Sequence, residues 1–321
     1  MNILVTSVGR RVKIIEYFKE TLKNKGKVIA TDCDRNAPAL YFADEFEIVP
    51  RVDDENYIST LIDISRKHKI SGIVSLIDPE LEILAQYKDV LEKEGLKLVL
   101  SPLDTIEKSF DKQKTYDLLS GLSIPCVPTY DNLEEFLTSL EQDRFTMPAI
   151  VKPKKGSASD GIQYVQEKNE LSSAFSKEDN LIIQPYFKDK EFGIDVYVDM
   201  LSGKLVDMFI KEKILMRSGE TDKSISVHNK EIEQLVKDFI SKTDFIGPLD
   251  IDCFEKDGKY YISEINPRFG GGYPHAYEMG NDFMSYIINN LQDEENSPYK
   301  GYNYQENYTM MKYDQVKIKR M

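Results

Sequence analysis

The feature that most constrains the fold is an alternation of short apolar runs with helical segments over the first hundred residues. Strands that alternate with helices predict βαβ units and a parallel sheet, so this part is expected to be α/β. The predicted strands are Asn2–Thr6, Val28–Thr31, Phe46–Val49, Gly72–Leu76 and Leu96–Leu100, and the predicted helices are Val12–Leu22, Ile58–His68 and Leu81–Leu91.

Charged residues follow three of these strands, at the sheet edge where open parallel sheets bind ligands. The segments are Ser7–Arg11, Asp32–Asp34 and Asp78–Glu80. The arginine pair suits an acidic group, and either acidic residue of the third segment suits an amine. Helix caps or surface charges are the alternative, since Asp-Pro-Glu also resembles a helix start with Pro in the first turn. The candidate substrate residues here are Arg10, Arg11, Asp78 and Glu80.

The second part of the chain is predicted to be α+β. We expect a boundary near Leu100–Pro102, which gives an α/β domain over residues 1–100 and an α+β domain over residues 101–321. Asp-Gly in the turn EKDG indicates a hairpin. Its strands are Leu249–Phe254 and Lys259–Ile265, and the other predicted strands are Ala149–Lys152, Gly161–Val165, Leu181–Gln184, Gly193–Met200 and Leu205–Ile214. The predicted helices are Asp111–Leu119, Leu133–Leu140, Lys230–Ser241 and Tyr277–Leu291, and the polar tail from Gln292 has no assigned structure.

Composition excludes several classes of protein. A formal net charge of −13 argues against a general binder of nucleic acid or anionic membranes, although it leaves room for a local basic pocket. Cys33, Cys126 and Cys253 are an odd, scattered set, which argues against a disulfide framework and a zinc site. No stretch approaches the ~20 apolar residues of a membrane span, and the start does not resemble a signal peptide. We therefore expect a cytoplasmic protein.

The most informative stretch is GPLDIDCFEKDGKYYISEINPRFGGG. Strand alternation puts Asp250 and Asp252 on one face, and Glu264 and Asn266 share a face of the return strand. Carboxylate and amide oxygens suit Mg²⁺, which binds together with substrate phosphates and needs few protein ligands. Arg268 follows, where it can meet a phosphate or a developing oxyanion. A solvated hairpin is the alternative, but three glycines after an arginine indicate backbone close to a ligand.

A second stretch, AIVKPKKGSASDG, suggests phosphate binding. Lys152 ends an apolar strand, and Lys154 leads into a loop of small residues whose backbone N–H groups can bind phosphates. The loop lacks the GxxxxGK[ST] pattern, so it is not a Walker-type P-loop, and a plain surface turn is the alternative.

Two more stretches add candidates. In NLIIQPYFKDKEFGID the proline after Gln184 forces an extended connection that can face a flat heterocycle, and Glu191 can hold a ribose. A strand–loop–strand with a buried aromatic pair is the alternative. In FIKEKILMRSGE the even spacing of Lys211, Lys213 and Arg217 predicts that they share one strand face, which is either near a γ-phosphate or solvated.

Together and in this order, these stretches resemble the ATP-grasp superfamily, and most closely the ATP-binding module of carbamoyl-phosphate synthase large subunits. The resemblance covers most of the chain: a preceding α/β domain, called pre-ATP-grasp, and the grasp domain, with a lid subdomain at about residues 125–190. EINPRFGGG is the most specific motif, and LIIQPY…KEFGIDV supports it.

The resemblance implies roles for individual residues. It implies that ATP with Mg²⁺, or Mn²⁺ in its place, is bound. Lys112 and Lys152 would bind the phosphates. The loop Lys154–Gly161, which includes Gly156, Ser157 and Gly161, would close over them. Adenine would lie against Gln184, Tyr186 and Phe187, and Glu191 would bind the ribose. The metal would lie on Glu264, Asn266 and one of Asp250 and Asp252, a choice that the sequence leaves open. Arg268 would stabilise the phosphorylated intermediate, with one or more of Lys211, Lys213 and Arg217 near the γ-phosphate. Tyr273 and His275, after the glycines, are further substrate candidates.

The implied reaction is ligation through an acyl phosphate. A carboxylate attacks the γ-phosphate of ATP, and an amine, a thiol or another nucleophile then displaces phosphate. One module without a glutaminase region fits a carboxylate–amine ligase for small biosynthetic or amino-acid substrates better than carbamoyl phosphate synthesis. Relatives are often dimers, so a homodimer is the expected assembly.

Two rival functions are weighed against the ligase. A non-catalytic ATP-binding or regulatory protein with the same fold is the main alternative. An NAD(P)-dependent oxidoreductase has the weaker case, because VTSVGRR lacks the GxGxxG glycines of a dinucleotide site.

Overall fold

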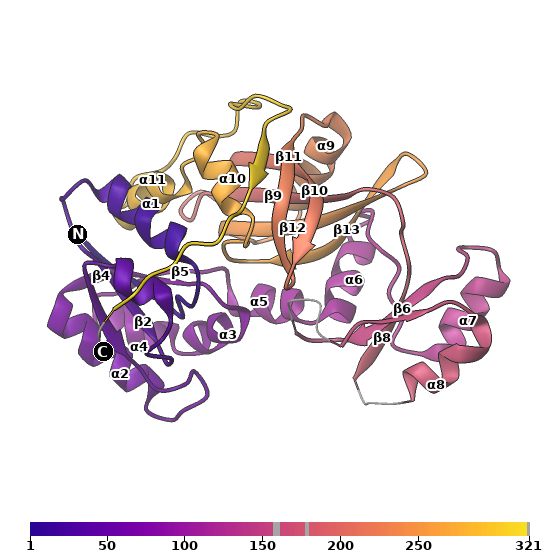
Figure 1. Ribbon diagram of the computed structural model, residues 1–321, viewed down its shortest axis with the longest axis horizontal. Helices are drawn as coiled ribbons and strands as arrows, with labels where there is room; N and C mark the ends of the chain where they lie inside the picture. The colour runs from indigo at the N-terminus through magenta and orange to yellow at the C-terminus, as the bar shows by residue number, and fades with distance from the viewer. Residues whose placement is uncertain (157–160, 177–179, 320–321) are drawn as a thin grey trace.

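The computed structural model describes residues 1–156, 161–176 and 180–319. Its N-terminal unit is a five-stranded parallel sheet in the order β3-β2-β1-β4-β5, which confirms the predicted α/β class (Figure 1). The strands are β1 (Asn2–Thr6), β2 (Val28–Asp32), β3 (Glu45–Ile48), β4 (Ile70–Ser75) and β5 (Lys97–Val99).

Helices cover both faces of this sheet. Ile3 and Val5 of β1 pack on one side and Leu4 packs on the other, as strand alternation requires. Leu4 faces α2 (Tyr57–His68), α3 (Asp78–Gln86) and α4 (Lys88–Lys93). The opposite face is covered by α1 (Val12–Leu22), the 3-10 helix η1 (Pro38–Phe42), α10 (Tyr273–Glu278) and α11 (Phe283–Leu291).

The last two helices therefore complete the core of the first unit. Their approach is close at Gly72 of β4, where an added Cβ would lie 2.6 Å from a methyl carbon of Leu291. Glycine fits this position because a Cβ would overlap the Leu291 side chain and force it to move.

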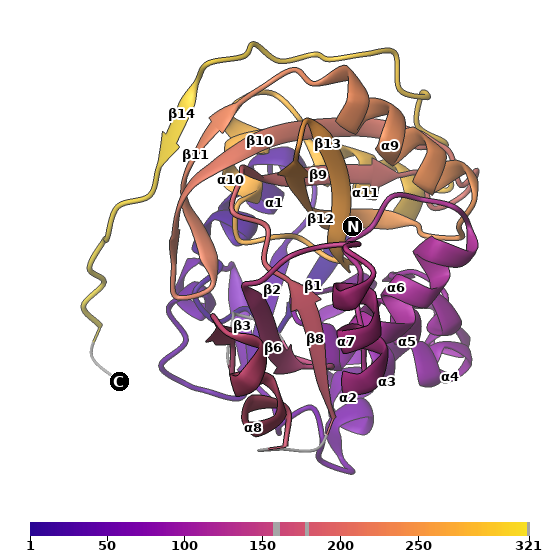
Figure 2. The same cartoon turned by 90° about the vertical axis from the view of Figure 1, so that its right-hand side faces the viewer.

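The larger sheet is antiparallel, in the order β13-β12-β9-β10-β11-β14 (Figure 2). Its strands are β9 (Glu191–Val198), β10 (Leu205–Arg217), β11 (Glu220–Ser226), β12 (Gly247–Lys256), β13 (Lys259–Asn266) and β14 (Thr309–Met311). Helix α9 (Lys230–Ser241) packs its apolar side on one face of this sheet, through Ile232, Val236 and Phe239.

A third, small sheet lies at the opposite end of the molecule from the N-terminal unit (Figure 1). It has the antiparallel order β7-β6-β8 and a separate core. Its elements are α7 (Leu133–Glu141), β6 (Ala149–Pro153), β7 (Gln163–Val165), the 3-10 helix η2 (Lys168–Glu170), α8 (Leu171–Phe175) and β8 (Leu181–Pro185). Helices α5 (Leu103–Phe110) and α6 (Lys112–Gly121) connect it to the parallel sheet. Among the described residues, no helix is both long and apolar enough to cross a bilayer.

Two predicted helices are wrong in extent. The expected helix Tyr277–Leu291 is two helices, because Gly280 takes φ +103° and ends the first one. The Tyr273 hydroxyl holds the break: it donates to the Asn281 carbonyl at 2.9 Å and accepts from the Phe283 N–H at 2.8 Å. The expected helix Leu81–Leu91 is likewise divided into α3 and α4, and α3 begins at Asp78 with Pro in its first turn.

Candidate functional site

A cavity of about 470 Å³ lies between the small sheet and the large one. Its walls come from β6, β7 and β8 on one side and from β10 to β13 on the other, and Arg11 of the N-terminal unit lies at its edge. Carboxylates, cations and aromatic side chains all line it. Four stretches singled out in the sequence therefore meet in one place.

Part of the cavity lining is aromatic and apolar. Tyr186 and Phe187 belong to it, and the Tyr164 ring lies edge-on to Tyr186 at 5.3 Å. Further apolar lining comes from Val127, Ile150, Ile162, Pro185 and Phe254, with the polar Gln184. This aromatic part of the lining is called the slot below. The Gln184 amide is fixed by a 2.8 Å hydrogen bond to the Thr129 hydroxyl. A flat apolar slot with a few fixed polar groups is suited to a heterocycle.

Next to the slot lie three lysines. The Lys112 ammonium donates to the Gly156 carbonyl at 2.7 Å, and Asp111 caps the helix that carries it. Lys152 lines the cavity, and its side-chain ammonium has no hydrogen bond or ion pair to any described residue. Burial lowers the pKa of Lys152, and the nearby Lys112 lowers it further, although Glu264 acts in the opposite direction. Lys155 lines the same wall. Such a cluster of cations is suited to phosphate groups.

The loop after Lys152 is only partly described. Lys154 turns away from the cavity lining and pairs with Asp131 at 2.7 Å. Gly156 lines the cavity with φ +117°, and Gly161 has φ +70° but does not line it. Ser157 lies outside the described residues, as does half of the predicted closing loop.

The predicted metal ligands lie together on the β12–β13 hairpin. Asp252 lies opposite Glu264, Asp250 lies opposite Asn266, and all four line the cavity. Burial raises the pKa of Asp250 to about 7, and the neighbouring Asp252 and Asp195 contribute to the shift. The described residues contain no group of three or more acidic, His or Cys side chains already arranged around one point. A small hard ion would therefore take part of its coordination shell from phosphate oxygens or water, as Mg²⁺ does.

Lys213 forms ion pairs with both the ribose candidate Glu191 and the metal candidate Asp252. Its ammonium lies 2.7 Å from Glu191 Oε1 and 2.6 Å from Asp252 Oδ1. Burial alone would lower the pKa of Lys213, but the two carboxylates outweigh burial and raise it. Gly193 makes room for this side chain, since a Cβ there would lie 3.2 Å from the Lys213 Cε.

The prediction that Lys211, Lys213 and Arg217 share one strand face is correct for Lys211 and Lys213, since a Cβ on Gly193 would lie 3.2 Å from the Cε of each, but it is wrong for Arg217. The β10–β11 register shifts twice after Lys213, so the even spacing no longer corresponds to one face. Lys211 is buried and paired with Asp195. Arg217 is exposed and pairs with Asp314 at 3.1 Å. Of the three, only Lys213 lines the cavity.

Arg268 and Arg11 also line the cavity. The Arg268 Nε and Nη2 both donate to Asp78 Oδ2, at 3.0 and 2.7 Å, and Nη1 lies 3.8 Å from Asp250. The Arg11 Nε lies 3.2 Å from Glu220 Oε1, and its Nη1 donates to the Phe269 carbonyl at 3.2 Å. Asp78 thus connects the parallel sheet to the arginine after the hairpin.

The other substrate candidates lie apart from the cavity. Arg10 is exposed and outside the lining. Glu80 is buried and accepts hydrogen bonds from the hydroxyls of Tyr57 and Ser75. Tyr273 is buried in the helix break described above. His275 is buried with its Nδ1 2.8 Å from the Ser224 hydroxyl, and burial together with Lys211 lowers its pKa to about 4.

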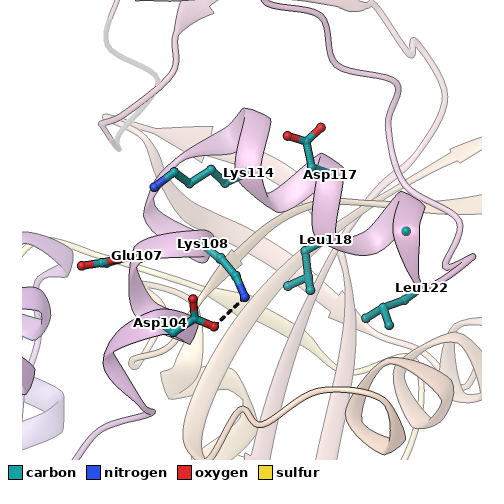
Figure 3. Close-up of a pocket in the computed structure, with 8 residues that line it drawn as sticks. Asp104, Glu107, Lys108, Lys114, Asp117, Leu118 and Leu122 are labelled. Atoms are coloured by element: carbon teal, nitrogen blue, oxygen red, sulfur yellow. Dashed lines mark hydrogen bonds and ion pairs between the residues drawn. The ribbon is translucent and has the colours of Figure 1, made fainter.

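A second hollow of about 470 Å³ lies on α5 and α6 (Figure 3). Its charged wall holds the 2.5 Å pair between Lys108 and Asp104, and Leu118 and Leu122 supply apolar surface. None of the residues singled out from the sequence lines it. We therefore assign the candidate site to the cavity between the two sheets.

Comparison with known families identifies this arrangement. A model described as the ATP-grasp domain matches residues 109–272, just over half of the 321 residues. This chain belongs to the ATP-grasp family. A second model, described as the PylC-like N-terminal domain, matches residues 3–99. The predicted family and the order of its two parts are thus confirmed.

The curated relatives are distant. The carbamoyl phosphate synthase large chain of Clostridium acetobutylicum is 24% identical over 275 residues, covering 80% of this chain and 24% of that one. The chain therefore spans about a quarter of the length of that relative. A D-alanine–D-alanine ligase of Fervidobacterium nodosum is 24% identical over 249 residues, covering 68% of this chain and 78% of the ligase.

Solved structures share the fold. The biotin carboxylase domain of Hydrogenobacter thermophilus 2-oxoglutarate carboxylase, in complex with MgADP, ADP and bicarbonate, has a TM-score of 0.75 at 17% identity and covers 96% of this chain and 73% of that one. N5-carboxyaminoimidazole synthetase of Staphylococcus aureus complexed with ADP has a TM-score of 0.71 at 19% identity. The match covers 89% of this chain and 76% of that one.

Sequence reasoning missed several lining residues of this ATP-grasp cavity. Ile150 lies two residues before Lys152 on β6, so strand alternation could have found it. Tyr164 reaches the cavity because β7 pairs with β6 and places it opposite Ile150, which the sequence does not reveal. Glu220 and Thr221 carry no motif, and they reach the cavity only because β11 pairs with β10.

Proposed function

We propose that this chain is an ATP-dependent ligase that activates a small carboxylic acid as an acyl phosphate and joins it to an amine. The groups that meet along β12 carry the proposal. Phe254 packs against Phe187, Asp252 lies opposite Glu264, and Asp250 lies 3.8 Å from Arg268, while Lys112 and Lys152 line the same cavity. This arrangement suits a base at the aromatic pair, phosphates at the carboxylates and lysines, and a substrate carboxylate at Arg268.

The proposed chemistry uses positioning and charge. A carboxylate oxygen attacks the γ-phosphorus, the bond from that phosphorus to the β–γ bridging oxygen breaks, and ADP leaves. The amine then attacks the acyl carbon, loses a proton, and phosphate leaves. Lys152 is suited to the phosphates because it has no ion pair among the described residues, and Arg268 is suited to the oxyanion. No side-chain nucleophile is needed in either step.

The hairpin has a donor set that fits Mg²⁺ or Mn²⁺. Asp252, Glu264 and Asn266 would hold the ion, because the two carboxylates face each other in register and Asn266 is next on the same face. Bound there, the ion would neutralise charge on the phosphates. Asp250 is assigned instead to orienting Arg268, whose Nη1 lies 3.8 Å away.

The experiment is a coupled measurement of ADP and phosphate release from Mg·ATP. A panel of amino acids and small carboxylic acids is tested singly and in pairs, with nucleotide affinity measured by calorimetry. Glu264→Gln is the site variant. Lys168→Met is its control, because Lys168 is an exposed small-sheet lysine paired with Glu141 outside the cavity.

We expect one acid to stimulate phosphate release, with the full rate only after an amine is added. Glu264→Gln should lose most turnover while its thermal unfolding stays near that of the wild type. ATP binding without turnover on any pair would favour the non-catalytic alternative. Failure to bind ATP would contradict both the ligase and the non-catalytic ATP-binding alternative.

A further inference from the structure

Two cations from opposite ends of the chain meet at one carboxylate in the cavity wall. The Arg11 Nε lies 3.2 Å from Glu220 Oε1, and the Lys312 ammonium lies 3.2 Å from Glu220 Oε2. Each carboxylate oxygen therefore has its own cation. Arg11 and Glu220 both line the cavity, and Lys312 contacts Glu220 from outside the lining.

The backbone fixes all three side chains. Arg11 directly precedes α1, and its Nη1 is held by the Phe269 carbonyl. Lys312 follows β14, which pairs with β11, and its backbone N–H donates to the Asp222 carbonyl at 3.0 Å. Glu220 begins β11 and packs on Gly271, where an added Cβ would lie 2.8 Å from its carboxyl carbon.

The segment that carries Lys312 spans two parts of the molecule. From β14 it runs across to the N-terminal unit, where the Lys317 ammonium lies 4.5 Å from the Phe42 ring centroid (Figures 1 and 2). Val316 and Ile318 on this segment are exposed, so few apolar contacts hold it. The position of Lys312 is therefore set mainly by β14 and Glu220.

Glu220 is the ion-pair partner of both cations, and neither Arg11 nor Lys312 has another ion pair among the described residues. Arg268 is held separately by its double hydrogen bond to Asp78. Asp250 and Asp222 attract Arg11 and Lys312 from farther away, and Arg10 adds positive charge near Glu220. An anion that contacts both Arg11 and Lys312 must therefore take the position that Glu220 occupies between them.

We propose that Arg11 and Lys312 form a subsite for an anionic group of the substrate acid other than its reacting carboxylate, and that Glu220 fills this subsite in the free protein. The inference rests on the proposed ligase function and narrows its substrate class to acids with a second anionic group, a carboxylate or a phosphate. The reacting carboxylate lies toward Arg268, and the second anionic group displaces Glu220 from its two cations.

The test is calorimetric titration of glutarate, butyrate and inorganic phosphate into protein saturated with Mg²⁺ and a non-hydrolysable ATP analogue. Glutarate carries a second carboxylate that butyrate lacks, and phosphate represents the alternative anion. The variants are Arg11→Gln, Lys312→Met, Lys312→Arg and Glu220→Gln. Arg51→Gln and Lys317→Met are matched controls, since Arg51 is exposed on the N-terminal unit and Lys317 lies on the same segment as Lys312.

The expected changes have opposite signs. Arg11→Gln and Lys312→Met should weaken glutarate or phosphate binding by about tenfold or more, because each loses a charge-assisted contact. Lys312→Arg should restore it. Glu220→Gln should tighten binding by about threefold, because the internal competitor loses its charge. Butyrate should bind weakly in all variants, and affinity for the ATP analogue should not change.

Three results would overturn the inference. The first is that neither dianion binds the wild type at millimolar concentration. The second is unchanged affinity in Arg11→Gln and Lys312→Met. The third is loss of binding in Glu220→Gln, which would make Glu220 a ligand for a cationic group. Failure of the proposed function is distinguishable, because it would appear in the same titrations as failure to bind the ATP analogue.

Discussion

Replacement of Lys152 by methionine should change nucleotide affinity and stability in opposite directions. The Lys152 ammonium lies in the cavity wall without a hydrogen bond or ion pair to any described residue, and burial lowers its pKa. In the free protein the charge is therefore a cost, since a charged group has left water without a partner. In the nucleotide complex the same charge would meet phosphate.

The magnitudes follow from these two environments. A charge-assisted hydrogen bond contributes ~1.5–3 kcal/mol, so Lys152→Met should weaken ATP binding by about 10- to 100-fold. Removal of a partly buried, unpaired charge should stabilise the free protein by about 1 kcal/mol, or about 2 °C in Tm. Calorimetric titration measures the change in ATP affinity. Thermal unfolding without nucleotide measures the change in stability.

Lys168→Met is the control for both measurements. Lys168 lies in η2, next to the small sheet that carries Lys152, but it is exposed and pairs with Glu141 at 2.7 Å. Its loss should leave ATP affinity unchanged and stability within about 0.5 kcal/mol, as for most surface changes. Unchanged affinity in Lys152→Met, or a clear drop in its stability, would refute the reasoning.

Three further predictions concern the hairpin and the core. Glu264→Gln should lose most Mg²⁺-dependent turnover, and normal turnover at saturating Mg²⁺ would count against a metal ligand. Burial opposes ionisation of Asp199, but hydrogen bonds led by Asn290 outweigh it and lower its pKa to about 2 from 3.8. Because the pKa of Asp199 is lower in the folded than in the unfolded protein, its ionised carboxylate stabilises the fold by about 2–3 kcal/mol above pH ~4. This stabilisation is lost as the pH falls toward 2. The free energy of unfolding of Asp199→Asn, measured over the same acid range, should not show this loss. Gly72→Ala should destabilise by about 1–3 kcal/mol in urea unfolding because its Cβ would overlap Leu291, and an unchanged midpoint would contradict that close contact.

Local periodicity accounts for what the sequence predicts well. The parallel sheet follows from the alternation of apolar runs and helical segments, and the ATP-grasp family follows from EINPRFGGG and its neighbours. Asp250 and Asp252 share a face because β12 is regular between them. The helix start at Asp78 is also local, since Pro79 favours the first turn.

The errors arise where structure departs from local periodicity. Register shifts in β10 separate Arg217 from Lys213, and sequence spacing does not reveal a bulge. Gly280 divides the last predicted helix although apolar residues recur on both sides of it. The cluster of Arg11, Glu220 and Lys312 joins both ends of the chain through tertiary contacts, so no short motif could indicate it.

The central claim is that a carboxylate attacks ATP in this cavity, and transfer of an oxygen isotope tests it most directly. The acid that stimulates phosphate release is labelled with ¹⁸O in its carboxylate and incubated with Mg·ATP and the amine. Mass spectrometry of the released phosphate is the readout. An acyl phosphate transfers one carboxylate oxygen, so the account predicts phosphate that carries one ¹⁸O. Unlabelled phosphate, released at the same rate, would contradict it.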